Sequence, residues 1–246
     1  MISLVQLANE KRLPDHQYMD SQTLDWIRKN KPDGYSNSLV KRVSFTTDVV
    51  EILSHYSPET DWFLEPDIIN SIHGLRHVLR CLAHTSILSK RVHFSAKETS
   101  EVLIAISLHD CRRTGDKNDS EHGKRASEWF IANLTTLQIK WKQLAGLNVK
   151  KIAKIIELHE VPYTEFKTIE ESYLPLINVL KTADALDRYR QPKLKWRINE
   201  KYIKLQPTKI EKFFAYNLVI KSENRYLSNN SSYLSVINTV SEYVSH

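Results

Sequence analysis

VLIAISLHD, residues 102–110, is the stretch that decides the fold. Its β-branched apolar residues would suit a buried strand as well as a buried helix. Ser95 and Glu98 precede it at the three-residue spacing of a capping box, a pair of side chains that satisfies free backbone N–H groups at a helix N-terminus. The stretch therefore predicts a central buried helix that ends near His109.

A second helix is predicted on the N-terminal side of this stretch. Pro66 suits the first turn of a helix, and apolar residues follow it at three- and four-residue spacing. These apolar residues are Ile69, Ile72, Leu75, Leu79 and Leu82. His73, His77 and His84 share one face of this helix, so the spacing alone allows any of the three to point into a common site.

Further helices carrying histidine or aspartate follow on the C-terminal side. Residues 111–121 have no periodic pattern and predict a loop, whereas residues 123–134 resume a helical pattern with His122 at its entrance. Two more apolar stripes each end on a polar residue, which would then point inward. One stripe is Val149, Ile152, Ile156 and then His159, and the other is Ile177, Leu180 and then Asp184.

The remaining chain reads as extensions of one main domain, which 246 residues are long enough to form. Residues 1–60 predict an accessory helical segment, with a turn at 31–34 and a helix at 46–54. Residues 61–190 would form the core, and residues 191–246 a basic helical extension packed on it. Within that extension the sequence LSNNSSYLS, residues 227–235, predicts a loop.

Composition favours an all-α protein. The chain has only 5 glycines, too few for the frequent tight turns of a β-sandwich or barrel, and none of them forms a Gly-x-Gly-x-x-Gly or P-loop phosphate cradle. Rossmann and kinase-type nucleotide folds are therefore excluded.

Charge and cysteine usage narrow the cellular setting. The net charge of +6 favours anionic ligands but is modest for a dedicated nucleic-acid binder. The 2 cysteines, Cys81 and Cys111, make neither a disulfide framework nor a zinc knuckle, which suits a reducing cytoplasm. Because the sequence has no signal peptide and no apolar run of membrane-spanning length, we expect a cytoplasmic protein without a membrane partner.

The pair His109-Asp110 ends the central apolar helix. A carboxylate at a buried helix end costs several kcal/mol unless a cation or hydrogen bonds compensate it, and a metal ion would do so. Imidazoles and carboxylates suit Mn, Fe, Mg, Zn or Ni, whereas two cysteines are too few for a thiolate site. The helices described above allow His77, His109, Asp110, His122, His159 and Asp184 to converge within the bundle, close to the compensating ion.

The order and spacing of these residues resemble the HD superfamily of metal-dependent phosphohydrolases. The resemblance covers residues 68–190 and runs from HVLR through HD and two further histidines to the Asp of LKTADALDRYR. It implies an HD-type helical bundle in which His77, His109, Asp110 and Asp184 bind one metal. His122 and His159 would complete a second metal site that Asp110 bridges.

The resemblance favours His77 over His73 and His84, because HVLR matches the family better. The turn after the HD pair departs from the family, since Cys111 and Arg112 occupy the next two places and the usual glycine is absent. His84 and His93 are interpreted as structural. His73, beside Gly74, either faces the substrate or fills the helix surface.

Basic residues near the expected site are candidates for binding an anionic substrate. Arg113, Lys124 and Arg125 could bind phosphate, although exposed helix starts and loops carry such residues in any case. Arg188 follows Asp184 by four residues, and with Asp187 it could orient a ligand at the rim of the site. A plain helical ion pair between Asp184 and Arg188 is the alternative.

The expected function is metal-dependent hydrolysis of a phosphate ester, with a nucleotide as the leading substrate class and Asp110, His122 and His159 at the catalytic centre. An HD-type di-iron oxygenase and a catalytically idle nucleotide or RNA sensor are the alternatives. Residues 193–212 mix lysines with Trp196 and Tyr202, as nucleic-acid-binding segments do, but an amphipathic helix with a buried aromatic face is the favoured interpretation. The sequence indicates neither the oligomeric state nor the metal.

Overall fold

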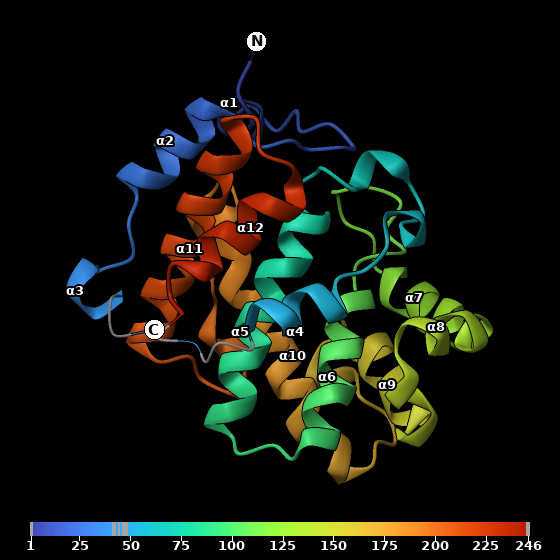
Figure 1. Cartoon of the computed structure of the whole chain (residues 1–246). Helices are drawn as coiled ribbons and strands as arrows, with labels where there is room; N and C mark the ends of the chain where they lie inside the picture. Colours follow the sequence, from blue (N-terminus) through green and yellow to red (C-terminus); the bar gives the residue numbers. More distant parts are fainter. Residues whose placement is uncertain (1, 41–42, 44, 46–48, 245–246) are drawn as a thin grey trace.

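The computed structural model describes residues 2–40, 43, 45 and 49–244, and in this part of the chain the regular structure is helical (Figure 1). The all-α prediction is confirmed. Phe45 and Val244 form an isolated β-bridge, and the described residues contain no strand. No helix among them is both long enough and apolar enough to cross a membrane.

The helices bear the labels of Figure 1. The α-helices are α1 (Leu4–Asn9), α2 (Ser21–Lys29), α3 (Asn37–Val40), α4 (Val49–Tyr56), α5 (Leu75–Arg91), α6 (Ala96–Leu108), α7 (His122–Ala132), α8 (Leu134–Lys140), α9 (Val149–Leu158), α10 (Leu174–Leu186), α11 (Lys209–Leu227) and α12 (Ser232–Ser241). The 3-10 helices are η1 (Thr60–Trp62), η2 (Pro66–Ile68), η3 (Lys142–Gly146), η4 (Tyr163–Glu165), η5 (Glu171–Tyr173), η6 (Asp187–Arg190), η7 (Leu194–Trp196) and η8 (Glu200–Tyr202).

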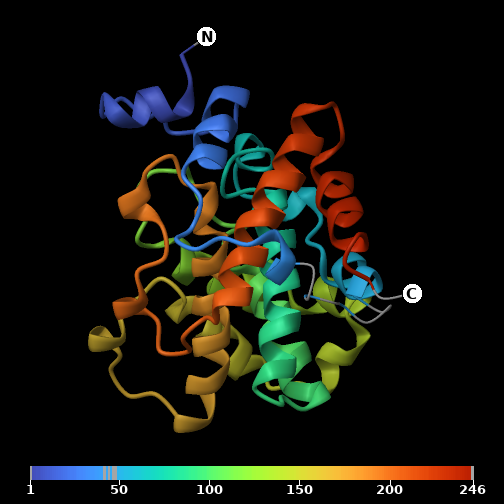
Figure 2. The ribbon, with the colours of Figure 1, turned by 90° about the vertical axis from the view of Figure 1, so that its left-hand side faces the viewer.

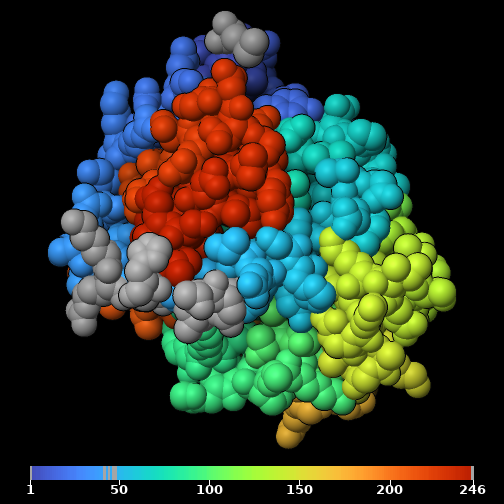
Figure 3. All heavy atoms as spheres, viewed as in Figure 1, coloured from blue at the N-terminus to red at the C-terminus, as the bar shows by residue number. Residues whose placement is uncertain are grey.

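Helix α5 runs through the middle of the molecule and packs against α6, α10, α11 and α12 (Figures 1 and 2). Almost all of its side chains are buried, as expected for a helix with neighbours on every side. Segments far apart in the sequence meet around it. On the face shown in Figure 3, α12 lies beside α4, with which it packs.

Helix α6 has the predicted capping box. The Ser95 hydroxyl accepts a hydrogen bond from the Glu98 backbone N–H at 3.3 Å, and the Glu98 carboxylate accepts one from the Ser95 N–H at 2.9 Å. The helix ends at Leu108 with His109 as its C-cap, which confirms the prediction for the central stretch.

The helix predicted from Pro66 is wrong in its start. Pro66 opens only the short η2, and α5 begins at Leu75 after Gly74. The chain folds back tightly here, since the Leu75 N–H donates to the Ile69 carbonyl at 2.9 Å. A Cβ on Gly74 would lie 2.1 Å from the Ile68 carbonyl oxygen, so this approach requires glycine. Ile69 and Ile72, which precede Gly74, therefore lie in turns and not in the helix.

Two other predictions need correction in the C-terminal part. Of residues 227–235, Leu227 still belongs to α11, and the loop ends at Ser231, whose side chain caps α12 by accepting from the Leu234 N–H at 3.1 Å. Residues 193–212 do not form an amphipathic helix before α11 but an irregular segment with η7 and η8, visible in orange along the outside in Figure 2.

In the N-terminal part, the turn at residues 31–34 is confirmed, with Gly34 at a φ of 65°. Of the predicted helix at 46–54, residues 46–48 lie outside the described residues, and the helix that the structure describes, α4, spans Val49–Tyr56. The predicted boundaries near residues 60 and 190 stay predictions.

Candidate metal centre

The six predicted metal ligands come from the ends of five helices, which the fold brings together. His77 lies in the first turn of α5, and His122 is the first residue of α7. His109 and His159 cap the C-termini of α6 and α9, and Asp184 lies in the last turn of α10. Asp110 directly follows the cap of α6.

Asp110 lies between two pairs of histidines. Its Oδ2 is 3.4 Å from His77 Nε2 and 3.8 Å from His109 Nε2. Its Oδ1 is 3.0 Å from His122 Nε2 and 3.7 Å from His159 Nε2. Each carboxylate oxygen thus faces one pair, as a carboxylate shared by two cations would.

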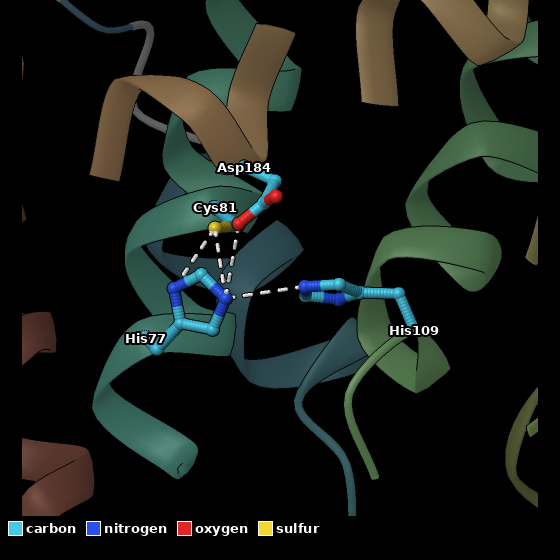
Figure 4. Close-up of side chains that lie close together, drawn as sticks. All are labelled: His77, Cys81, His109 and Asp184. Atoms are coloured by element: carbon cyan, nitrogen blue, oxygen red, sulfur yellow. Dashed lines mark hydrogen bonds and ion pairs between the residues drawn. The ribbon is translucent and has the colours of Figure 1, made fainter. Parts of the chain in front are cut away.

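The ring nitrogens within each pair are close. His77 Nε2 lies 3.1 Å from His109 Nε2 and 3.4 Å from Asp184 Oδ1 (Figure 4). On the other side of Asp110, His122 Nε2 lies 2.9 Å from His159 Nε2. The four rings are packed edge to face along the series from His77 through His109 and His159 to His122.

Hydrogen bonds at the other ring nitrogens assign the tautomers. His109 Nδ1 and His159 Nδ1 each lie 2.7 Å from a backbone carbonyl oxygen, of Ile106 and Ile156 respectively, and a carbonyl can only accept. His77 Nδ1 donates to Asp187 Oδ2 at 2.8 Å. When these rings are neutral, each Nε2 therefore carries a lone pair. Lone pairs that point at one another repel, and a cation bound between them removes this repulsion.

His122 follows the same pattern. Its Nδ1 donates to the Asp119 carbonyl and lies 2.9 Å from Glu160 Oε2. Gly123 permits the close crossing of α7 and α9 that brings His122 to His159, because a Cβ there would lie 2.9 Å from the Glu157 carbonyl oxygen and 3.1 Å from His159 Cε1.

The electrostatics suit cation binding. Burial lowers the pKa of His109 to about 3, so its ring is neutral. Burial opposes ionisation of Asp184 and Asp110, but the surrounding histidine and arginine side chains outweigh it. They hold the pKa of Asp184 at about 2 and that of Asp110 well below its ordinary value. Burial would also lower the pKa of His122, yet its hydrogen bonds to Asp110 and Glu160 raise it to about 9, so a proton occupies this position when no metal does.

Two groups of side chains here could hold a metal ion. They are His77, Cys81, His109 and Asp184 (Figure 4), and His109, Asp110 and His159. Cys81 was not among the predicted ligands. Its Sγ lies 3.4 Å from His77 Nδ1 and 3.9 Å from His77 Nε2, and burial raises the pKa of its thiol well above the ordinary value. As a protonated thiol it is a poor ligand beside imidazoles and carboxylates.

Asp187 is buried behind His77 and not at the rim of the site. It accepts hydrogen bonds from His77 and from Arg80 Nε at 2.6 Å, and it pairs with Arg190 at 3.3 Å. Arg80 also donates to Glu223 of α11 at 2.6 Å. One signal for this network is present in the sequence, namely the arginine three residues after His77, because buried charges rarely occur unpaired.

His73 and His84, the other two histidines of the helix predicted from Pro66, lie in different settings. His73, in the turn before α5, lines the cavity beside the centre, and its Nδ1 bonds Asp116 Oδ1 at 2.7 Å. His84 lies two turns beyond His77 and packs edge to face on Phe214. Burial lowers the pKa of both rings to about 4.

A cavity of about 920 Å³ opens on Asp110, His122, His159 and Asp184. Arg113 and Arg188 line it, as do Lys181 and Glu160, which were not among the predicted site residues. The segment after α10 forms one wall with Trp196 and residues 199, 201, 202 and 203. Sequence periodicity could not place this wall, because the segment has no regular secondary structure.

The predicted basic residues divide into two groups. Arg113 Nη1 lies 3.5 Å from Asp110 Oδ1 and 3.2 Å from His122 Nε2. Lys124 and Arg125 are not among the residues that line the cavity. The Lys124 side chain is 62% exposed, and Arg125 pairs with Asp119 at 2.5 Å. Among the described residues no ion pair joins Arg188 to Asp184, so that alternative is absent and Arg188 faces the cavity unpaired.

In comparisons with known proteins, no family model, no curated protein and no solved structure matches the chain.

Proposed function

We propose that this chain is a divalent-metal-dependent phosphohydrolase of the HD type that acts on a phosphate ester, most simply a nucleotide. The observation that carries the proposal is the convergence of four imidazole Nε2 atoms on the two oxygens of Asp110, with Asp184 on one side. This nitrogen and oxygen donor set suits one or two ions such as Mn, Fe, Mg, Zn or Ni. His77, His109, Asp110 and Asp184 would hold one ion, and Asp110, His122 and His159 the other.

Bound divalent ions would supply Lewis acidity and an activated water, which is sufficient for phosphate-ester hydrolysis. The chain itself supplies the rest. Arg113 is held beside Asp110 by hydrogen bonds to the carbonyls of Gly115 and Lys117, at 3.0 and 2.8 Å, so its charge is fixed at the edge of the centre where an anionic substrate would enter. The Glu160 carboxylate accepts from the Gly123 N–H at 2.8 Å and orients His122.

Anaerobic reconstitution tests the reaction class. Protein stripped of metal and reloaded with Mn²⁺ or Mg²⁺ under argon should release phosphate from at least one member of a panel of nucleotides and phosphomonoesters. Asp110→Ala should abolish this activity and sharply lower bound metal, because Asp110 faces both histidine pairs. Lys124→Ala is the matched control on a nearby exposed residue and should change neither.

Three outcomes would contradict the proposal. Turnover that required both iron and O₂ would favour a di-iron oxygenase, which the same donor set could serve. Nucleotide binding without turnover by any metal form would favour a sensor. Full metal occupancy in Asp110→Ala would contradict the site itself.

A further inference from the structure

The lysine and arginine side chains that line the cavity differ in whether they already have a partner within the protein. Four of them have a hydrogen-bond or ion-pair partner. Arg113 donates to two backbone carbonyls, and Lys181 donates to the carbonyls of His159 and Val161 at 2.8 and 2.6 Å. Arg190 donates to the Ile72 carbonyl at 2.6 Å and pairs with Asp187, while Lys117 pairs with Asp15 at 2.9 Å.

Arg188 and Lys201 are the two lining cations whose side chains have no partner in the described part of the chain. The lining carboxylates do not neutralise them. Asp116 bonds His73, Asp119 bonds Arg125, and Glu160 bonds His122. Asp110 and Asp184 face the histidines. Two unpaired positive charges, both on exposed side chains, therefore line the cavity in addition to the candidate metal centre, as a second anionic group would require.

Aromatic side chains line the same cavity as these charges. Trp196 and Tyr202 line the same wall, and Tyr202 is 72% exposed although it is a large aromatic residue. Planar rings that line a cavity together with cations form the kind of surface on which a nucleobase stacks.

The wall is fixed at both ends. Arg197 donates to the Asn30 carbonyl, and its guanidinium lies 5.5 Å from the ring centroids of Trp26 and Tyr189. At the other end, the Thr182 hydroxyl of α10 donates to the Leu205 carbonyl at 2.9 Å. A wall anchored in this way loses little conformational entropy when a ligand binds.

We propose that Arg188 and Lys201 bind a second phosphoryl group and that Trp196 and Tyr202 stack on a nucleobase, so that the site prefers a nucleoside di- or triphosphate to a monophosphate. The cavity of about 920 Å³ is large enough for such a ligand, since small-molecule sites commonly span ~300 to 1,000 Å³. The inference rests on the proposed function in one respect, namely that the reacting phosphoryl group lies at the metal centre.

Equilibrium binding of a non-hydrolysable analogue tests this preference without any need for turnover. Titration calorimetry would compare α,β-methylene-ADP with AMP on the Mn²⁺-loaded protein. We expect the analogue to bind at least tenfold more tightly than AMP. The double variant Arg188→Gln, Lys201→Gln should reduce the ratio of the two affinities to threefold or less. AMP has no second phosphoryl group for these cations to bind, so only the analogue should lose affinity. Lys195→Gln, an exposed lysine of the same segment that does not line the cavity, should leave the ratio unchanged.

The aromatic wall has its own variants. Trp196→Ala should weaken binding of both nucleotides by about fivefold or more, in line with the loss of a base-stacking contact, whereas Trp196→Phe should retain most of the affinity. The affinity for inorganic pyrophosphate should not change in Trp196→Ala, since pyrophosphate has no base.

Failure of this inference differs from failure of the proposed function. Equal affinity for AMP and the analogue, or an unchanged ratio in the double variant, overturns the inference even if the protein hydrolyses phosphate esters. A preserved tenfold preference that the double variant removes, in a protein that hydrolyses nothing, supports the inference and contradicts the hydrolase.

Discussion

At the scale of single residues, His122 would link the candidate metal centre to pH. Hydrogen bonds to Asp110 and Glu160 outweigh burial and raise its pKa from 6.5 to about 9, so in the metal-free protein it carries a proton at neutral pH. A metal at this position must displace that proton, because only the neutral ring is a ligand. Metal binding and protonation would therefore compete for the same nitrogen.

We predict that the apparent affinity for the second metal rises by up to tenfold per pH unit between pH 7 and about pH 9 and then levels off. Calorimetric titration in buffers of different ionisation enthalpy would report about one proton released per ion at pH 7. His122→Ala should remove both this ion and the proton release while leaving the other ion bound. Affinity that is independent of pH would contradict the assignment of His122.

The same pKa has a stability consequence with a defined sign. A histidine whose folded-state pKa is raised stabilises the fold fully below its unfolded value of 6.5 and loses this contribution as the pH rises through about 9. The metal-free protein should therefore unfold at a lower temperature at pH 9.5 than at pH 6. His122→Ala should reduce this difference.

At the scale of elements, the sequence predicted α6 and the inward faces of α9 and α10 because local signals sufficed there. The capping box at Ser95 and the apolar stripe that ends at His159 are each contained in a dozen residues. The start of α5 was mispredicted because it depends on Gly74 fitting against the Ile68 carbonyl, a contact that no periodicity records. The loop before α12 was overextended because serine serves equally as a loop residue and as an N-cap.

The site shows the same division between local and tertiary information. The order of histidines and aspartates along the chain, together with the match of HVLR to the HD superfamily, predicted residues that the structure brings together, although the sequence placed His77 inside a helix and not near its start. The partners that hold them come from elsewhere. Asp187 behind His77 reaches Arg80, and Arg80 reaches Glu223 of α11, which no helical spacing connects to the site.

The crossing of α7 and α9 gives an element-scale prediction. Gly123→Ala should destabilise the protein by about 1–3 kcal/mol, because a Cβ would press on the Glu157 carbonyl and on His159. It should also lower affinity for the second metal by moving His122 away from His159. Thermal unfolding and metal analysis would measure the two effects.

Gly146→Ala is the matched control, since a Cβ there has nothing within 4 Å. It should change stability by no more than about 0.5 kcal/mol, and metal content not at all. Equal effects of the two substitutions would show that the helix crossing does not position the histidines.

At the scale of the whole molecule, the C-terminal helices belong to the same core as the candidate metal centre. Phe213, Phe214, Leu218 and Val219 of α11 are buried in the hydrophobic cluster that also contains α5 and α6. Buried charges cross this contact as well. Glu223 pairs with Arg80 at 2.6 Å and with Arg76 at 2.9 Å, and Arg76 also lies 3.5 Å from the centroid of the Tyr226 ring. Residues 61–190 are thus joined to α11 by both apolar and ionic contacts.

Glu223 and Glu242 provide a matched pair for testing how much this contact contributes. Glu223→Ala should destabilise the protein by about 3–5 kcal/mol, because it leaves Arg76 and Arg80 buried with one carboxylate fewer. Glu242→Ala removes a carboxylate that also pairs with two cations, Lys221 and Arg225, but these groups are about one-third exposed, so the loss should be about 0–1 kcal/mol. Urea unfolding of both variants gives the comparison. Because Arg80 also holds Asp187 against His77, Glu223→Ala should also weaken binding of the metal ion proposed at His77. A Glu223→Ala variant that lost neither stability nor bound metal would show that residues 61–190 form their site without α11.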